Sequence, residues 1–351
     1  MKILSLLICV AVFFPSPLFG REKNDIIVMK NGDHITCEIK GLRSNTLYIS
    51  VDYILSTLSV DWTKVGHVQS KQLFLVRTQD GTVYTGALST PETSDGRPLQ
   101  LEVLESPEEK VTLKREQVVL LNETSSNFWQ RLNGHIGTGL TYSKGNDSTQ
   151  YNLNSDIKYS RERWSAEARY SSNLTANSGA NTSTRNEVGF SATRLFRWNN
   201  WYYTGVTDVL QSSVQGIQLQ STFGGGIGRI IKNTGSTSLT VYGGFAWQRI
   251  NYNETVHPSL TQQVTSGLIG SSLKLFRFDR TTLTLNATFL PAISEPGRMH
   301  FNLSTSYYVK LFGKLDWNFT LYGNWDNRPP PGFSSSDYGT TSGLSLSFGN
   351  R

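Results

Sequence analysis

The carboxyl-terminal two hundred or so residues alternate between apolar and polar side chains, segment after segment. From Met299 to Leu311 most odd positions are apolar, and the even positions are mostly polar. Residues 315–326 repeat the pattern with Leu315, Trp317 and Phe319 on the apolar phase. Successive side chains of a strand point to opposite faces, so each segment would have one apolar and one polar face. The alternation therefore predicts an antiparallel sheet.

We predict twelve such strands, each with the ten or so residues that a tilted strand needs to cross a hydrocarbon layer. They cover residues 130–144, 149–160, 163–173, 185–197, 200–212, 217–231, 237–251, 262–276, 281–291, 297–311, 315–326 and 337–348. Short turns with a basic residue alternate with longer loops, such as 172–184 and 326–337. Bacterial barrels have short periplasmic turns and longer outer loops. The sequence thus predicts an all-β chain that ends in a twelve-stranded antiparallel transmembrane β-barrel.

The first twenty residues predict secretion. Lys2 is followed by an apolar run from 3 to 14 and by Gly20, which is the pattern of a signal peptide with cleavage after Gly20. No later apolar run approaches the roughly eighteen residues of a membrane helix, so strands must make any crossing. We therefore expect the outer membrane of a Gram-negative-type bacterium, with outer-membrane lipid around the barrel.

Composition agrees with a barrel. Only 17% of the 351 residues are charged, and the mean hydropathy is −0.32, because half of each barrel strand faces away from lipid. The net charge of +6 fits a solvated surface better than nucleic-acid binding, so no nucleic-acid partner is expected. Cys9 would leave with the signal peptide, and Cys37 is expected to be a small buried residue without a disulfide.

Residues 21–123 predict a small β module with an internal repeat. The segment 25–70 lines up with 73–121, and Asn31-Gly32 and Asp80-Gly81 occupy equivalent positions. Asn-Gly and Asp-Gly are tight-hairpin signals, because glycine accepts positive φ. About five short strands per repeat suit an SH3-like or Sm-like barrel. We expect the module to lie in the periplasm and to bind a periplasmic protein or the cell wall.

Four segments follow from these patterns. They are a signal peptide (1–20), a periplasmic β module (21–123), a linker (124–128) and an outer-membrane barrel (129–351).

Seven ionisable residues fall on the polar phase of predicted strands and become candidate lumen residues. They are Asp156, Lys158, Glu167, Arg169, Glu187, Asp316 and Asp326. One interpretation is a self-neutralising network that fills and stiffens the interior, since buried charges need partners. The other is a selectivity lining for a small solute. The sequence does not give the width of the lumen, so both interpretations stay open.

Catalytic and metal-binding patterns are sparse. The sequence has no Cys-x-x-Cys, no histidine pair at metal spacing and no phosphate-binding lysine loop. His257 lies beside Pro258 and near Glu254 in a predicted outer loop, which is weak grounds for chemistry. The run Gly224–Gly228 lies within a strand and predicts close strand packing. We expect no enzyme activity, no catalytic residues, no bound metal and no cofactor.

Several segments resemble the family known as domain of unknown function 481, whose members are bacterial outer-membrane proteins, some labelled salt-induced. The resemblance is carried by 325–348, with its Pro-rich loop and Asp337-Tyr338, by Gly224–Gly228 with Arg229, and by the Phe196-Arg-Trp region. The family implies a barrel over roughly 129–348 and offers no catalytic residues.

The last strand carries a predicted assembly signal for the barrel assembly machinery. It consists of Tyr338, Leu344, Leu346 and Phe348, at alternate positions. The chain departs from the usual pattern because Gly349, Asn350 and Arg351 follow the aromatic residue.

The signal peptide, the barrel and the N-terminal module together predict a narrow pore or solute-uptake channel with a docking module. The alternative is a closed barrel that keeps the envelope intact or mediates adhesion.

Overall fold

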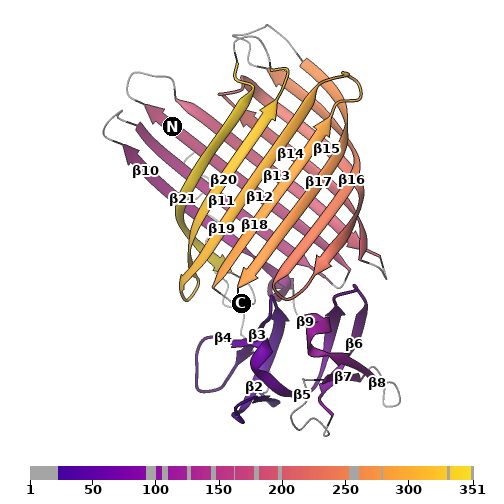
Figure 1. Ribbon diagram of the computed structural model, residues 1–351. Coiled ribbons are helices and arrows are strands. Elements are labelled where there is room, and N and C mark those ends of the chain that lie inside the picture. Colours follow the sequence, from indigo (N-terminus) through magenta and orange to yellow (C-terminus); the bar gives the residue numbers. More distant parts are fainter. Residues whose placement is uncertain are drawn as a thin grey trace.

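The computed structural model describes residues 23–91, 100–104, 110–124, 128–143, 148–161, 163–177, 182–196, 200–252, 261–277, 280–329 and 333–348. The predicted signal peptide, His257 with its neighbours, and Pro330 lie outside these residues. Within the described part of the chain, no helix is long and apolar enough to cross a membrane. The described elements are strands and three short 3-10 helices, arranged in a module and a barrel (Figure 1).

The N-terminal module, residues 25–123, forms one nine-stranded sheet. Its elements are β1 (Asp25–Met29), β2 (His34–Arg43), β3 (Thr46–Ser50), β4 (Leu58–Asp61), η1 (Trp62–Lys64), β5 (Val65–Thr78), β6 (Val83–Ser89), β7 (Gln100–Leu104), β8 (Lys110–Lys114), η2 (Arg115–Gln117) and β9 (Val118–Glu123). Both predicted hairpins are present: Gly32 and Gly81, in the β1–β2 and β5–β6 turns, have φ of 90° and 89°. Glycine is favoured there because other side chains are strained at positive φ.

The twofold repeat appears in the strand order. β1 pairs with β2 and with the first half of β5, while the second half of β5 pairs with β6 and β9. In each repeat the first strand therefore lies between the second strand and the last strand of that repeat. The last strand is β5 in the first repeat and β9 in the second, and a 3-10 helix precedes each of them. The long strand β5 belongs to both repeats, and β9 also pairs with β2. The two repeats thus share one sheet and cannot be two independent domains. The SH3-like or Sm-like likeness stays a prediction.

The module encloses one apolar core. Residues of both repeats belong to the same buried cluster, including Ile27, Trp62, Phe74 and Leu121. Trp62 is 1% exposed, and its indole N–H donates to the carbonyl of Arg115 at 3.3 Å. Cys37 is buried in the same cluster, at the kind of position that small apolar residues occupy.

The C-terminal part forms a closed barrel of twelve antiparallel strands in sequence order. They are β10 (Leu132–Ser143), β11 (Ser148–Ser160), β12 (Trp164–Asn177), β13 (Ser183–Leu195), β14 (Trp201–Ser212), β15 (Ile217–Asn233), β16 (Thr237–Tyr252), β17 (Thr261–Arg277), β18 (Thr281–Pro291), β19 (Met299–Phe312), β20 (Leu315–Asp326) and β21 (Ser336–Phe348), and η3 (Phe128–Arg131) precedes them. β10 pairs with β21 to close the barrel. The predicted fold class and strand number are confirmed.

One predicted loop is wrong. Residues 172–177 belong to β12, and β13 already begins at Ser183, so the connection is only five residues long. Its small polar residues resembled a loop, but Ser172 pairs with Leu153 and with Asn186, and the ladder continues to Asn177. The connections at the end of the barrel where β12 joins β13 have four to nine residues. The connections at the other end have two to five residues.

The barrel is apolar outside and polar inside. Side chains on one phase of the strands, such as Phe190, Ile227, Phe245 and Leu346, are exposed on the outer face. Aromatic rings gather near the short turns, where Phe128 stacks on Tyr159 at 4.9 Å. An outward apolar band bounded by aromatic residues is typical of barrels that lie in lipid.

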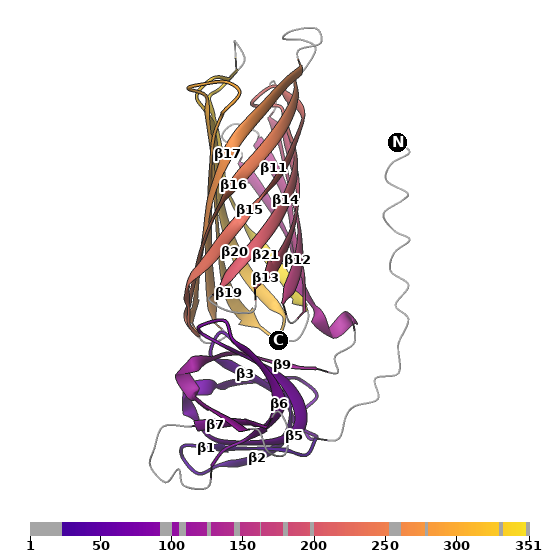
Figure 2. The same ribbon diagram turned by 90° about the vertical axis from the view of Figure 1, so that its right-hand side faces the viewer.

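The module lies against the end of the barrel that carries the short turns (Figure 2). Asn200, in the turn before β14, donates its side-chain amide to the carbonyl of Gln79 at 2.7 Å. A Cβ on Gly81 would lie 2.4 Å from the Asn200 side chain, and one on Gly235 would lie 1.9 Å from that of Asn45. Glycines therefore let two module hairpins approach two barrel turns.

Candidate functional site in the barrel lumen

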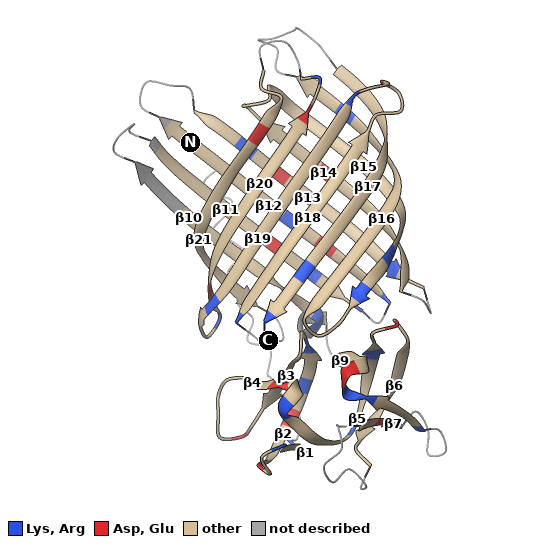
Figure 3. Cartoon of the chain, viewed as in Figure 1, with Lys and Arg blue, Asp and Glu red and all other residues tan. Residues whose placement is uncertain are grey.

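All seven predicted lumen residues lie on the inner phase of their strands. Asp156 and Lys158 alternate with the exposed Tyr151 and Leu153 of β11, and the other five likewise occupy the phase opposite to the exposed apolar side chains of their strands. Figure 3 shows acidic and basic positions on the barrel strands, with Lys and Arg gathered at the end near the module. The structure thus divides the seven residues into a wall cluster and three separate ionic contacts.

Four of the seven form the wall cluster on β11 and β12. Asp156 lies opposite Arg169, and Lys158 lies opposite Glu167, in the register of these strands. The Arg169 side chain also approaches Glu167, at 3.7 Å. Directly opposed residues of unlike charge attract one another across a strand pair. This wall is therefore close to charge balance.

A lysine from the far side of the barrel interacts with this wall. Lys274 lies on β17, six strands from β11 in the closed order, and it interacts electrostatically with Asp156, Lys158 and Glu167. Inside a closed barrel such an interaction must act through the lumen. Lys274 therefore places a positive charge on the part of the barrel opposite this wall.

Arg185 of β13 crosses the lumen nearer the long-loop end. Its guanidinium donates to Asp337 of β21 at 2.8 Å and to Glu187 at 2.7 Å. Three strands separate β13 from β21 in the barrel, so the Arg185–Asp337 pair passes through the interior. Ser212, at the end of β14, donates to the same Asp337 oxygen at 3.1 Å, and Arg185 lies over the Tyr322 ring at 5.1 Å. These contacts form a bridge through the interior between β13 and β21.

Arg298 makes a second bridge at the long-loop end. It lies just before β19 and is 1% exposed. Its guanidinium donates to Asp326 at 2.8 Å, to Gln262 at 2.8 Å and to the Tyr252 hydroxyl at 3.2 Å. These partners belong to β20, β17 and β16. Arg298 thus connects the long-loop ends of several strands and holds Asp326 at the rim.

Near the short turns, His135 of β10 lies between Asp316 and Tyr308. Its Nδ1 is 3.7 Å from an Asp316 carboxylate oxygen, and its ring stacks on Tyr308 with centroids 4.6 Å apart. Asp316 is 1% exposed. The seventh predicted residue, Asp316, thus lies in the wall beside a histidine of a strand two places away.

The sequence identified all four residues of the wall cluster, and outside it identified Glu187, Asp316 and Asp326 but missed their partners. Arg185, Asp337 and Lys274 all lie on polar phases, so the alternation rule could have found them. Arg298 lies on the polar phase of the predicted strand 297–311, so the same rule could have found it, although in the structure it precedes β19. The alternation of apolar and polar residues along one strand does not show which strands face one another across a closed barrel.

The expectation of no enzyme activity stays a prediction. Among the described residues, no group of three or more His, Cys, Asp or Glu is placed to hold a metal ion. His257 and Glu254 lie outside the described part of the chain. Tyr338, Leu344 and Leu346 of the predicted assembly signal point outward from β21, and Phe348 ends that strand opposite Gly134 of β10.

The family model for "Protein of unknown function, DUF481" matches residues 136–348. The chain belongs to this family. The match covers nearly the whole barrel, from early in β10 to the end of β21, and none of the N-terminal module.

Two solved structures are similar to this chain at low sequence identity. The NanC porin is 9% identical over 61% of this chain and 98% of its own, with a TM-score of 0.38. The translocator domain of the autotransporter NalP from Neisseria meningitidis is 13% identical over 62% and 86%, with a TM-score of 0.33. No protein with a curated description matches the sequence. At these values, the likenesses assign neither substrate nor transport to this family member.

Proposed function

We propose that this DUF481 protein is an outer-membrane β-barrel that forms a narrow, charge-lined channel for small polar solutes. The observation that carries the proposal is the lumen itself, whose lining is polar and whose charges lie in groups along its length. Charged side chains around a constriction select solutes by sign and size. The contacts that cross the lumen, such as Arg185–Asp337, are made by side chains, and side chains can rearrange when a solute passes.

The orientation follows from the connections. Short turns and the N-terminal module lie at one end of the barrel (Figure 2), and bacterial barrels keep their short turns in the periplasm. We place the module in the periplasm, beneath the channel, where it is available to a periplasmic protein or to the cell wall. A protease added to intact cells should cut the loop around Pro330 and spare residues 25–123. Cleavage of the module alone would reverse this orientation.

A closed barrel is the second candidate, because the two arginine bridges narrow the lumen. Single-channel recording with the full chain in a planar bilayer separates the two. The channel predicts small ohmic steps for the wild type and larger steps for the double variant Arg185→Gln, Asp337→Asn, which lacks one bridge. Arg194→Gln is the matched control, because Arg194 is on the same strand but faces outward. An electrically silent wild type would refute the channel and favour the closed barrel.

A further inference from the structure

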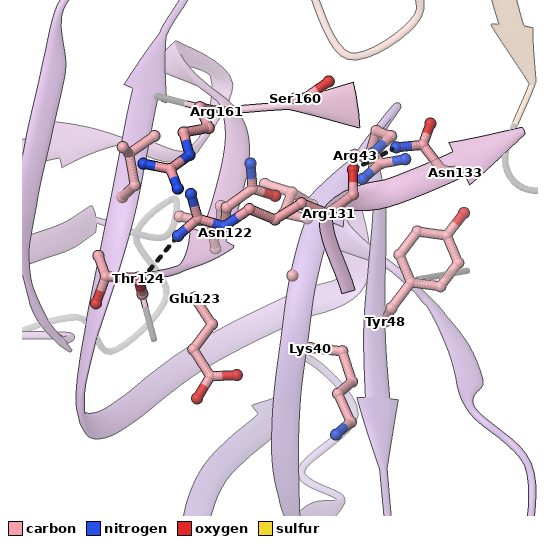
Figure 4. Close-up of a pocket in the computed structure, with 14 residues that line it drawn as sticks. Lys40, Arg43, Tyr48, Asn122, Glu123, Thr124, Arg131, Asn133, Ser160 and Arg161 are labelled. Atoms are coloured by element: carbon pink, nitrogen blue, oxygen red, sulfur yellow. Dashed lines mark hydrogen bonds between the residues drawn. The ribbon is translucent and has the colours of Figure 1, made fainter. Parts of the chain in front are cut away.

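A hollow of about 660 Å³ opens on the outer face of the barrel, over strands β14 to β19. Small-molecule sites measure about 300–1,000 Å³. The hollow between the module and the barrel has only about 50 Å³, and there Arg131 donates to the carbonyl of Thr124 at 3.2 Å (Figure 4). The walls of the large hollow include Ile227 and Ile269, which are exposed on the outward phase of their strands. The large hollow therefore opens away from the lumen.

Small side chains form the floor of this hollow. Gly243, Ser271 and Ala287 lie on the outward phase of β16, β17 and β18. Gly243 lies directly between Ile227 and Ile269 of the neighbouring strands. A Cβ on Gly243 would have no neighbour closer than 3.8 Å, so strand packing does not require glycine there. The missing side chain instead leaves a depression between two isoleucines.

The hollow runs obliquely across the barrel wall. Trp201, Arg229, Val241, Ser271 and Ala287 are successive cross-strand partners and all line it. Trp201 is the first residue of β14, at the short-turn end, whereas Ala287 lies in the middle of β18. Barrel strands are tilted, so a row that crosses them also changes depth. The hollow therefore leads from the short-turn end toward the middle of the barrel.

The end of the hollow near the short turns is positively charged. The Arg229 guanidinium lies over the Trp201 ring at 5.6 Å, and in the described structure this side chain makes no ion pair and no hydrogen bond. A ring face attracts the cation but leaves its N–H groups for an acceptor. Arg194, also outward, lies opposite Tyr203 on the neighbouring strand. Aromatic residues at this level of a barrel lie among lipid headgroups.

The charges of the outer face favour a lipid over a second copy of the chain. On the described barrel strands, every Asp and Glu lies on the inward phase. A symmetric dimer through this face would therefore bring Arg229 against no strand carboxylate. A phospholipid supplies both a phosphate for the positive end and an acyl chain for the apolar length. Arginine matches phosphate oxygens in pairs.

We infer that this hollow binds one glycerophospholipid molecule of the inner leaflet. Its phosphate accepts hydrogen bonds from Arg229, and one acyl chain lies over Gly243 and points toward the middle of the barrel. The inference rests on the proposed membrane location and orientation. It does not rest on transport, because a closed barrel would present the same outer face.

Native mass spectrometry of the full chain in a non-ionic detergent tests the inference. The probe is phosphatidylethanolamine with one palmitoyl and one oleoyl chain. The wild type should retain one lipid under conditions that strip the others, and Gly243→Leu should lose it, because leucine fills the floor. Arg229→Gln should weaken binding about tenfold, as expected for a lost charged hydrogen bond. Gly205→Leu is the matched control: Gly205 is exposed on β14 outside the hollow, a Cβ there meets no atom within 4 Å, and the lipid should stay bound.

Three results would overturn the inference. They are a wild type that retains no lipid, equal retention by the wild type, Gly243→Leu and Arg229→Gln, and a dimer that disappears in Gly243→Leu, which would assign the hollow to a second copy. Quenching of Trp247 by brominated lipid tests the membrane location separately, because Trp247 is outward but outside the hollow. A quenched Trp247 without binding that depends on Gly243 would refute the lipid site alone, and an unquenched Trp247 would refute the location itself.

Discussion

The bridge between Arg185 and Asp337 allows a quantitative test of the lumen network. Both side chains are 6% exposed, and their nitrogen and oxygen atoms are 2.8 Å apart. Arg185→Gln leaves the Asp337 carboxylate with the Ser212 hydroxyl as its remaining described partner. Removing one member of a buried pair costs about 3–5 kcal/mol, because the other charge stays buried. We expect the lower end of that range, since Glu187 on the same network is part exposed.

The double variant Arg185→Gln, Asp337→Asn removes both charges and should recover part of this loss. Contacting residues in one network couple by about 0.5–3 kcal/mol, and the cross-lumen geometry predicts a coupling of at least about 1.5 kcal/mol. Urea unfolding of the refolded chain in lipid vesicles, followed by tryptophan fluorescence, measures all four corners of the cycle. Additive single effects would show that the two side chains do not meet in the lumen, and would refute the bridge.

Two further predictions concern the module. Trp62→Ala should destabilise it by about 3–5 kcal/mol, because the indole is fully buried in the shared core; calorimetry should show the module transition shifted while the barrel keeps its heat modifiability on gels. Burial and the nearby His34 lower the pKa of His67 in the folded chain. Between that lowered pKa and the ordinary value of about 6.5, the unfolded chain binds more protons than the folded chain. The free energy of unfolding therefore rises with pH across this range. His67→Gln should flatten that slope in urea titrations at pH 5 to 7, and an unchanged slope would contradict the assignment.

Strand positions in the barrel could be predicted from local pattern alone. One face of every strand carries the exposed apolar side chains, so a shift of one residue would turn the apolar set inward, and the alternation fixes the phase. The exception is the segment 172–177, where Leu174 and Ala176 continue the apolar phase of β12 but lie among small polar residues that resembled a loop. There the ladder with its neighbours shows that the strand continues.

The ionic contacts of the lumen could be predicted only in part. Lys158 and Glu167 were recognised as inward-facing because phase is a local property. The pairing of Arg185 with Asp337 spans 152 residues and depends on barrel closure, which no single segment encodes.

The central claim is that lipid covers the outward-facing half of the barrel side chains. Brominated lipids quench tryptophan on contact, so two single-tryptophan chains refolded into such vesicles test it directly. Trp247, outward on β16, should be strongly quenched, and Trp62, buried in the module, should keep its fluorescence. Equal quenching of the two, or a chain that stays dissolved without detergent or lipid, would contradict the account.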